Sequence, residues 1–419
     1  MRIATGHIYN IARNSMADAS EAVAKTQQQI STGQRVINPS DDPVASTKII
    51  SLNNELESIE QYQNNINAAK DNLITQESIL GSINNLIQRV QEIAIQAGNT
   101  ATLSTSEYSA LASEVDSRLD ELQNMMNTKN ASGEYIFGGY KSASAPFTGD
   151  ASSGFSYLGD EGQQYIKIAN GTSIAATDSG KDIFVDVDSD NFSVNTSVSS
   201  ANRSFPALSI SVGQIVDQEA YDEFYPEDMK ITFNAVTNIV PAAENYTITE
   251  RSTGRVIMEN QPYASGADIV VHGVSVKISG NPVSASTDYA GDSLFVDSTT
   301  KQDILTTLSR FSDAMTTYDG TSESRDALDG AIASTLNNLT NAQTSVLEAT
   351  STIGARMNTL ESTEDLHYDS DLVTRDLLSQ LQDLDYAEAA TRLSAQILVL
   401  EAAQSSFVTI SRLSLFNQL

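Results

Sequence analysis

Proline is absent from two long stretches of this chain, and this limits the possible folds more than any other feature. The eight prolines lie between residues 39 and 282, which leaves residues 44–145 and 283–419 without the strongest helix breaker. Eighteen of the 27 Phe and Tyr residues lie between Tyr135 and Phe295, and 15 of the 22 Gly residues lie between Gly133 and Gly291. We therefore expect helices at both ends and a different kind of structure in the middle.

Apolar residues recur in steps of three and four along both proline-free stretches, as they do on one face of a helix. The first stripe runs over residues 44–97, a helix of about 80 Å at 1.5 Å per residue, which needs another helix along its side. Further stripes follow at 108–126, 304–318 and 328–360. We expect one antiparallel bundle of two long and at least two shorter helices, which closes only if the middle of the chain is an insertion.

The middle of the chain has the two-residue periodicity of β-strands. Alternating apolar residues occur in 229–233, 245–249 and 273–278, and residues 252–254 resemble a short hairpin loop. Residues 150–299 carry 21 acidic and seven basic side chains. The predicted fold class is mainly α with an inserted β domain: a long antiparallel helical bundle built from both chain ends, plus a small, acidic, antiparallel β domain whose strand order stays open.

The two ends of the chain resemble coiled-coil strands without a partner. Their apolar residues share one helix face but are too few to stabilise an isolated helix in water. Two interpretations stay open: ordinary terminal helices docked on the bundle, or an assembly surface that becomes ordered only in a multimer. The predicted interface residues are Ile8, Ile11, Val23, Ile30, Leu393, Ile397, Leu400, Phe407, Ile410 and Leu413.

A connecting turn is predicted between the N-terminal helix and the bundle. Gly33 permits an unusual φ, and Pro39 and Pro43 stop helices. Asp41 and Asp42 are placed to cap the helix that begins near Pro43. We expect three domains: terminal assembly helices in 1–43 and 376–419, a helical rod in 44–147 and 300–375, and an outward-facing β domain in 148–299.

Composition argues against several classes of function. The chain has 54 acidic and 24 basic residues, a net charge of -30, which opposes binding to nucleic acid or to anionic lipid. It has no Cys, so disulfides, thiol nucleophiles and Cys-ligated metals are excluded. The first 30 residues lack the apolar run of a cleaved signal, and no later run approaches the roughly 18 residues of a membrane span.

No motif for catalysis or for a metal is complete. His7, His272 and His367 lie far apart and lack a carboxylate or hydroxyl partner at a recognisable spacing, so each is expected to face solvent rather than to act in catalysis. Three aspartates in residues 186–190 match the first half of a calcium-binding loop, but the second half is absent. We therefore expect no enzyme activity, no metal and no cofactor.

Several segments resemble the flagellin superfamily. The matches at the two ends, in the expected order, are ISTGQRVINPSDDPVAS (30–46), TIGARMNTLES (352–362) and the segment from YAEAATRLSAQILVLEAA to LSLFNQL (386–419). Within the superfamily, other segments resemble the hook-associated proteins of the hook-filament junction. They are DDP (41–43), YIFGGYKSASAPF (135–147), and GVSVKISGNP with AGDSLFV (273–296). The chain is therefore identified by resemblance as a member of this family.

The resemblance implies a structural protein of the bacterial flagellum. Paired terminal helices would line an inner tube of identical subunits, and the central insertion would face outward. The expected partners are other copies of the chain in a ring, a hook-side junction protein, flagellin and a dedicated export chaperone at the C-terminal segment. The resemblance also implies export by the flagellar type III apparatus to an extracellular site without a cleaved signal. Filament flagellin is the main alternative, and a secreted protein with an adhesive or enzymatic central domain is another.

Overall fold

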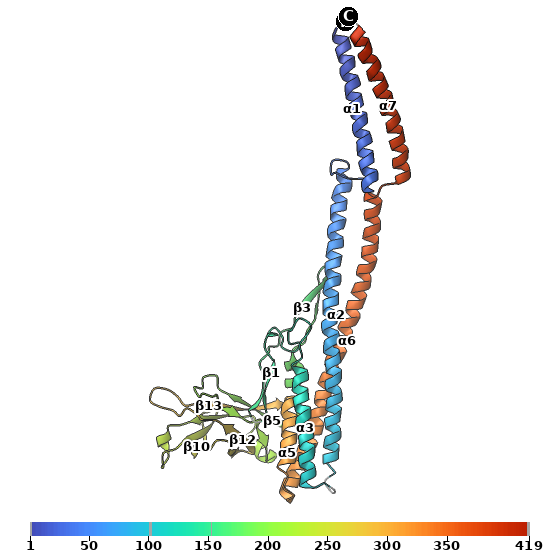
Figure 1. Ribbon diagram of the computed structural model, residues 1–419. Coiled ribbons are helices and arrows are strands. Elements are labelled where there is room, and N and C mark those ends of the chain that lie inside the picture. The colour runs from blue at the N-terminus through green and yellow to red at the C-terminus, as the bar shows by residue number, and fades with distance from the viewer. Residues whose placement is uncertain (1, 100–102, 152, 417–419) are drawn as a thin grey trace. The chain divides into compact units, whose positions relative to one another are not determined.

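The computed structural model describes residues 2–99, 103–151 and 153–416 of the chain. It is mainly helical, with a central antiparallel β region, which confirms the predicted fold class. The long helices are α1 (Arg2–Thr32), α2 (Pro43–Ala97), α3 (Thr105–Met126), α5 (Ile304–Thr316), α6 (Ser322–Gln382) and α7 (Tyr386–Phe416), and α4 (Gln218–Phe224) is short (Figure 1).

Local sequence signals place the helix ends. The Ser104 hydroxyl accepts a hydrogen bond from the Glu107 backbone N–H, and the Glu107 carboxylate accepts one from the Ser104 backbone N–H, so a capping box begins α3. The Asp303 carboxylate caps α5 by accepting a hydrogen bond from the Thr306 N–H at 2.6 Å. The helix α2 ends at Ala97, directly before Gly98 and Asn99, and these two residue types are typical of a helix end.

Thirteen strands lie in the middle of the described chain. They are β1 (Phe147–Asp150), β2 (Gly154–Tyr157), β3 (Tyr165–Ala169), β4 (Thr172–Ala175), β5 (Asp188–Val198), β6 (Ser209–Ile210), β7 (Gln214–Ile215), β8 (Met229–Phe233), β9 (Asn245–Glu250), β10 (Val256–Pro262), β11 (Asp268–Val271), β12 (Val274–Ser279) and β13 (Ser293–Lys301). All the pairings among them are antiparallel.

The strands form two sheets and two separate hairpins. The larger sheet has the order β10-β9-β8-β13-β5. In the smaller sheet β12 pairs with β11 on one side and with β6 and β7 on the other, while β1-β2 and β3-β4 are the hairpins. The three strands predicted from alternating residues are β8, β9 and β12, and the predicted loop at 252–254 joins β9 to β10.

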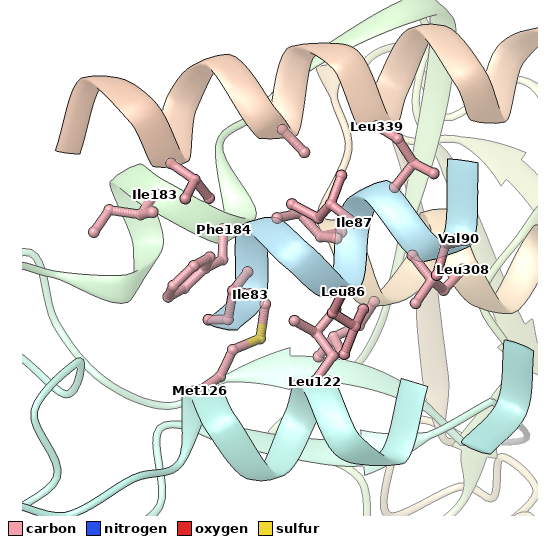
Figure 2. Packing of buried hydrophobic residues seen from close by; sticks show 14 of the residues in the cluster. Ile83, Leu86, Ile87, Val90, Leu122, Met126, Ile183, Phe184, Leu308 and Leu339 are labelled. Atoms are coloured by element: carbon pink, nitrogen blue, oxygen red, sulfur yellow. The ribbon is translucent and has the colours of Figure 1, made fainter. Parts of the chain in front are cut away.

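The described chain forms two compact units. The first contains residues up to 65 and from 361 onward, and the second contains 66–360. Within the second unit, α2, α3, α5 and α6 share one hydrophobic core, where Ile87, Leu122 and Leu339 are fully buried (Figure 2). Side chains of residues 147–187, including Phe184, join that core.

A second hydrophobic core lies between the two sheets. It contains alternate residues of β8, Met229, Ile231 and Phe233, which are almost fully buried, together with Val274 of β12. The alternation that predicted these strands is therefore the alternation between this core and the opposite face of the sheet.

The proposed domain boundaries at residues 43, 147, 299 and 375 stay a prediction.

Two minor expectations can be compared with the structure directly. His367 does not face solvent: it is buried, because its ring packs on Tyr62 of α2 with the ring centroids 5.4 Å apart. His7 and His272 are exposed, as expected. The aspartates of residues 186–190 form no metal-binding group with other described residues, and Asp188 instead pairs with Lys301 at 2.5 Å.

Candidate assembly interface

The first and last helices of the chain pack against each other. The rings of Tyr9 in α1 and Phe407 in α7 lie 5.2 Å apart between centroids. Farther along the pair, Nη2 of Arg392 donates a hydrogen bond to Oε1 of Gln29 at 2.8 Å. Residue numbers therefore rise along α1 as they fall along α7, so the two helices are antiparallel and lie side by side (Figure 1).

Half of the predicted interface residues lie on the inner face of this pair. Val23 and Ile30 in α1, and Leu393, Leu400 and Phe407 in α7, are all half-buried. None of these five is fully buried, because a helix pair covers one side of each helix and leaves the edges of the contact open to solvent. The structure thus brings these residues to one pair of helices but leaves part of each in contact with solvent.

The other predicted residues lie away from this inner face or outside the described part of the chain. Ile8, Ile11 and Ile397 are exposed, with 49%, 54% and 41% of their surfaces accessible. The side chains of Ile410 and Leu413 are not among those that the structure describes.

Further apolar residues on α7 are exposed as well. Leu398, Val399 and Val408 have accessible fractions of 67%, 59% and 48%. Single exposed apolar residues are ordinary on a protein surface, but several on one helix leave apolar side chains available for further contacts. The described part of the terminal pair therefore has an inner seam and additional apolar side chains exposed outside it.

Two polar residues in the seam were not predicted. Thr26 and Gln29 are buried in α1, and the Gln29 amide donates to the Arg35 carbonyl at 2.6 Å while its oxygen accepts from Arg392. A hydrogen-bonded amide in a helix pair costs less than an unpaired one and fixes the register of the two helices. Thr26 lies three residues after Val23 and Gln29 lies three residues after Thr26, and this helical spacing is the sequence signal that could have identified them.

Gly33 ends α1 in a left-handed backbone conformation. Its φ is +70°, a region that favours glycine, and its N–H donates to the Gln29 carbonyl at 2.9 Å. A Cβ atom at this position would lie 2.9 Å from the hydroxyl of Tyr386, the first residue of α7. Gly33 therefore also allows the start of α7 to approach the end of α1.

The turn after α1 is bonded to the segment between α6 and α7. The Leu384 N–H donates to the Gly33 carbonyl at 2.9 Å, and the Arg35 N–H donates to the Gln382 carbonyl at 2.7 Å. The Arg35 guanidinium also donates to the Leu381 carbonyl at 2.8 Å. These contacts join residues 346 to 351 positions apart, so no local pattern in the sequence could have revealed them.

The two aspartates have different partners. The Asp42 carboxylate accepts from the Ala45 N–H at 3.0 Å and so caps α2, which begins at Pro43. The Asp41 carboxylate accepts from the Asn38 N–H at 3.1 Å and pairs with the Lys25 ammonium at 2.6 Å.

Asp41 thus fixes the turn to α1 rather than capping α2. The Lys25 ammonium, followed by the backbone hydrogen bond from Asn38, lowers the pKa of the Asp41 carboxyl below its ordinary value. Pro39 is exposed within the turn.

The described residues offer little ligand chemistry. They contain no group of three or more His, Asp or Glu side chains placed to hold a metal ion. Across the described helices, none combines the length and the apolar character that a bilayer span requires. What the site supplies is apolar helix surface and a turn that fixes two helix ends, which suits contacts between proteins rather than chemistry.

Residues 3–142 match the family model described as the bacterial flagellin N-terminal helical region. Flagellar hook-associated protein 3 of Salmonella typhimurium is 35% identical over 147 residues, which cover 35% of this chain and 46% of the relative. The Escherichia coli protein of the same name is 34% identical over 148 residues, with 35% and 46% coverage. Flagellin of Escherichia coli is 30% identical over 120 residues, which cover 29% and 24%. The matches thus span about half the length of the hook-associated relatives.

Solved structures extend the likeness to most of the chain. Flagellar hook-associated protein 3 from Legionella pneumophila has a TM-score of 0.53 and 26% identity, and the match covers 80% of this chain and 98% of that one. FlgL from Xanthomonas campestris has a TM-score of 0.50 and 22% identity, covering 78% and 99%, and supports the fold alone. The likeness therefore extends beyond the N-terminal part that the family model matches.

Proposed function

Since this chain belongs to the flagellin superfamily and is of its hook-associated protein 3 (FlgL) type, we propose that it is an adaptor at the hook-filament junction of the bacterial flagellum. It is a structural protein and not an enzyme. Copies of it polymerise through the paired α1 and α7 helices into a ring that joins a hook-side junction protein to flagellin.

The exposed apolar surface of the α1–α7 pair carries this proposal. Ile8, Ile11, Ile397, Leu398 and Val399 all have at least 41% of their surface accessible in a single copy. Burying such a side chain contributes about 1.5 to 3 kcal/mol when it leaves water completely. Several of them on each copy therefore provide a driving force for assembly.

The extent of the sequence matches favours the junction over the filament. The hook-associated relatives match over 147 and 148 residues at 34–35% identity, whereas the Escherichia coli flagellin matches over 120 residues at 30%. A junction protein occupies one short zone, while a flagellin extends along the filament. Immunolabelling of intact flagella should therefore mark a single zone beside the hook, and labelling along the whole filament would favour flagellin.

Export and partner binding belong to the same proposal. We place the protein outside the cell, delivered by the flagellar type III apparatus without a cleaved signal. A dedicated chaperone binds the C-terminal segment before export, which would cover the apolar surface of α7 until assembly. Neither nucleic acid nor membrane is a partner.

A double substitution tests the assembly surface. Ile11→Ser with Ile397→Ser removes two exposed apolar side chains, so the chain should fold normally but be lost from isolated flagella, with loss of motility. Val270→Ser is a matched control, because Val270 in β11 is 54% exposed but lies far from the terminal helices in sequence. Normal incorporation of the double variant would contradict the proposal, and an altered thermal melt of the monomer would show a folding defect instead.

A further inference from the structure

The last third of α6, residues 361–382, exposes more large apolar side chains than is usual for a helix on the surface of a monomeric protein. Leu366, Tyr368, Leu372, Val373 and Leu377 are 64%, 58%, 69%, 59% and 45% accessible. They lie within 12 positions of one another, all in the first compact unit. Their arrangement around the helix shows what can cover them.

The inner face of this segment is already occupied. His367 and Thr374 are buried at 7% and 4% accessibility, and the His367 ring packs on Tyr62 of α2. Residues seven apart on a helix share a face, because each residue turns by about 100°. This face defines the side of α6 that is turned toward its own chain.

The exposed apolar residues fall into two groups, one on each side of that inner face. Leu366, Val373 and Leu377 lie within about 40° of one another and about 100° from His367 in one direction. We name these three the first flank. Tyr368 and Leu372 lie about 100° to 140° from His367 in the other direction, and we name them the second flank.

The outer face between the two flanks is acidic. Asp365, Asp369 and Asp376 occupy one arc of about 40°, roughly opposite the inner face. All three are exposed. Burying these carboxylates under a partner would require their desolvation without a matching cation, so this arc should stay in water.

This arrangement limits what can cover the segment. A single partner on the outer side would bury the acidic arc before it reached both flanks. A membrane surface offers apolar contact on one side only, and the net charge of -30 opposes an anionic one. Two separate neighbours, one on each side, cover both flanks and leave the aspartates exposed.

We propose that residues 361–382 of α6 contact two neighbouring copies of this chain, the first flank of each copy facing the second flank of the next. In a ring, every copy has a neighbour on both sides, and the two contacting surfaces are different. The inference rests on the proposed ring and adds to it a lateral contact surface outside the α1–α7 pair.

Disulfide cross-linking in isolated flagella tests the pairing, and the natural chain has no Cys to interfere. One set of chains carries two cysteines, one from each flank, in the six combinations of positions 366, 373 and 377 with 368 and 372. Mild oxidation should link neighbouring copies into a ladder of dimers, trimers and larger products in at least one combination. Chains with a single cysteine, such as Val373→Cys or Leu372→Cys, should stay monomeric, because like flanks do not meet.

The control places two cysteines on the acidic arc, as Asp369→Cys with Asp376→Cys, and should give no ladder. The inference is overturned if all six combinations assemble into motile flagella yet none forms a ladder, or if single-cysteine chains form dimers. The proposed function fails differently: the unsubstituted chain would then be absent from the isolated junction. Incorporation of each variant, measured by immunoblot of the flagella, separates the two failures.

Discussion

α6 is one continuous helix, yet its two parts have opposite surroundings. Along residues 328–360 one stripe of apolar side chains faces the core shared with α2, α3 and α5, where Leu339, Val346 and Ile353 are at 0% accessibility. Along residues 361–382 the apolar side chains Leu372 and Val373 are 69% and 59% accessible. The same kind of side chain therefore stabilises the monomer in one part and remains available in the other.

The difference shows that spacing determines the helix but the number of neighbours determines what the helix does. In the second compact unit several helices enclose the stripe, so its burial stabilises a single copy. In the first unit the helices lie in pairs, and a pair encloses only one side of each helix. This organisation fits the proposal that the chain folds through its second unit and assembles through its first.

The largest expected effect compares the two parts of α6 directly. Leu339→Ala should reduce the free energy of unfolding by about 3 to 5 kcal/mol, because it leaves a cavity in a closed core. Leu372→Ala should change it by no more than about 0.5 kcal/mol, because the side chain is exposed in the monomer. Urea denaturation of the monomer measures both. Equal losses of unfolding free energy in the two variants would contradict the difference between the two parts of α6.

A second comparison on the same helix uses ion pairs. Arg356 donates to both oxygens of the Asp178 carboxylate at 2.8 and 2.9 Å, with side chains only 16% and 11% accessible. Arg356→Ala leaves Asp178 largely buried without its cation, so we expect a loss of about 2 to 4 kcal/mol.

The matched control is Arg375, which pairs with Asp371 at 2.7 Å but is 66% accessible. Arg375→Ala should cost about 0.5 kcal/mol or less, because exposed pairs are screened by water and salt. The losses of stability in both variants are measured by urea denaturation of the monomer. A larger loss for Arg375→Ala would mean that the first unit is held together as tightly as the second.

Two glycines should respond in opposite directions. Gly33→Ala should destabilise the end of α1 by about 1 to 2 kcal/mol, because φ is +70° and the new Cβ meets the Tyr386 hydroxyl. Gly354→Ala should stabilise α6 by about 0.5 to 1 kcal/mol, because Gly354 is inside the helix with open space around its Cβ position.

Hydrogen exchange locates these two effects. Faster exchange should appear in the first turn of α7 for Gly33→Ala, and slower exchange should appear around residue 354 for the other variant. If Tyr386→Phe fully rescues Gly33→Ala, the hydroxyl contact and not the backbone conformation is the source of the strain.

Much of the fold could be predicted because its elements have one buried face. β8 was found from Met229, Ile231 and Phe233, which are the residues that point into the core. β5 was not found, although it has 11 residues, because most of its side chains are polar and its pairing with β13 comes from far along the chain. Strand formation there depends on tertiary contacts rather than on local pattern.

The candidate site shows the same limit at finer scale. The apolar spacing predicted one apolar face on each terminal helix, but a shift of one residue decides which side chain meets the partner helix, since each residue turns the helix by about 100°. Tyr9, and not Ile8, lies against Phe407. The helix-end contacts of Gly33 and Arg35 with residues 381–384 needed the structure, because sequence separation hides them.

The smallest expected effect compares two aspartates whose pKa values are lowered for different reasons. In the first unit the Lys25 ammonium lowers the pKa of Asp41. In the second unit the hydroxyls of Ser324 and Thr321 lower the pKa of Asp319 to about 2. Each carboxylate therefore contributes stability at a pH above its unfolded pKa of about 3.9, and that contribution is lost as pH falls through the lower folded value.

Salt and substitution should separate the two aspartates. Lys25→Gln should raise the pKa of Asp41 toward its ordinary value, while the Asn38 and Ile37 N–H groups keep it below that value. Raising the salt concentration to 1 M should shift Asp41 in the same direction but leave Asp319 unchanged, because screening weakens an ion pair far more than a hydrogen bond from a neutral hydroxyl. Carboxyl carbon NMR between pH 1.5 and 6 follows both residues, with Lys48→Gln as the control for charge removal. If neither Lys25→Gln nor 1 M salt changes the pKa of Asp41, the backbone N–H groups alone fix this turn. The turn after α1 would then be held by hydrogen bonds from neutral groups, as the start of α6 is at Asp319.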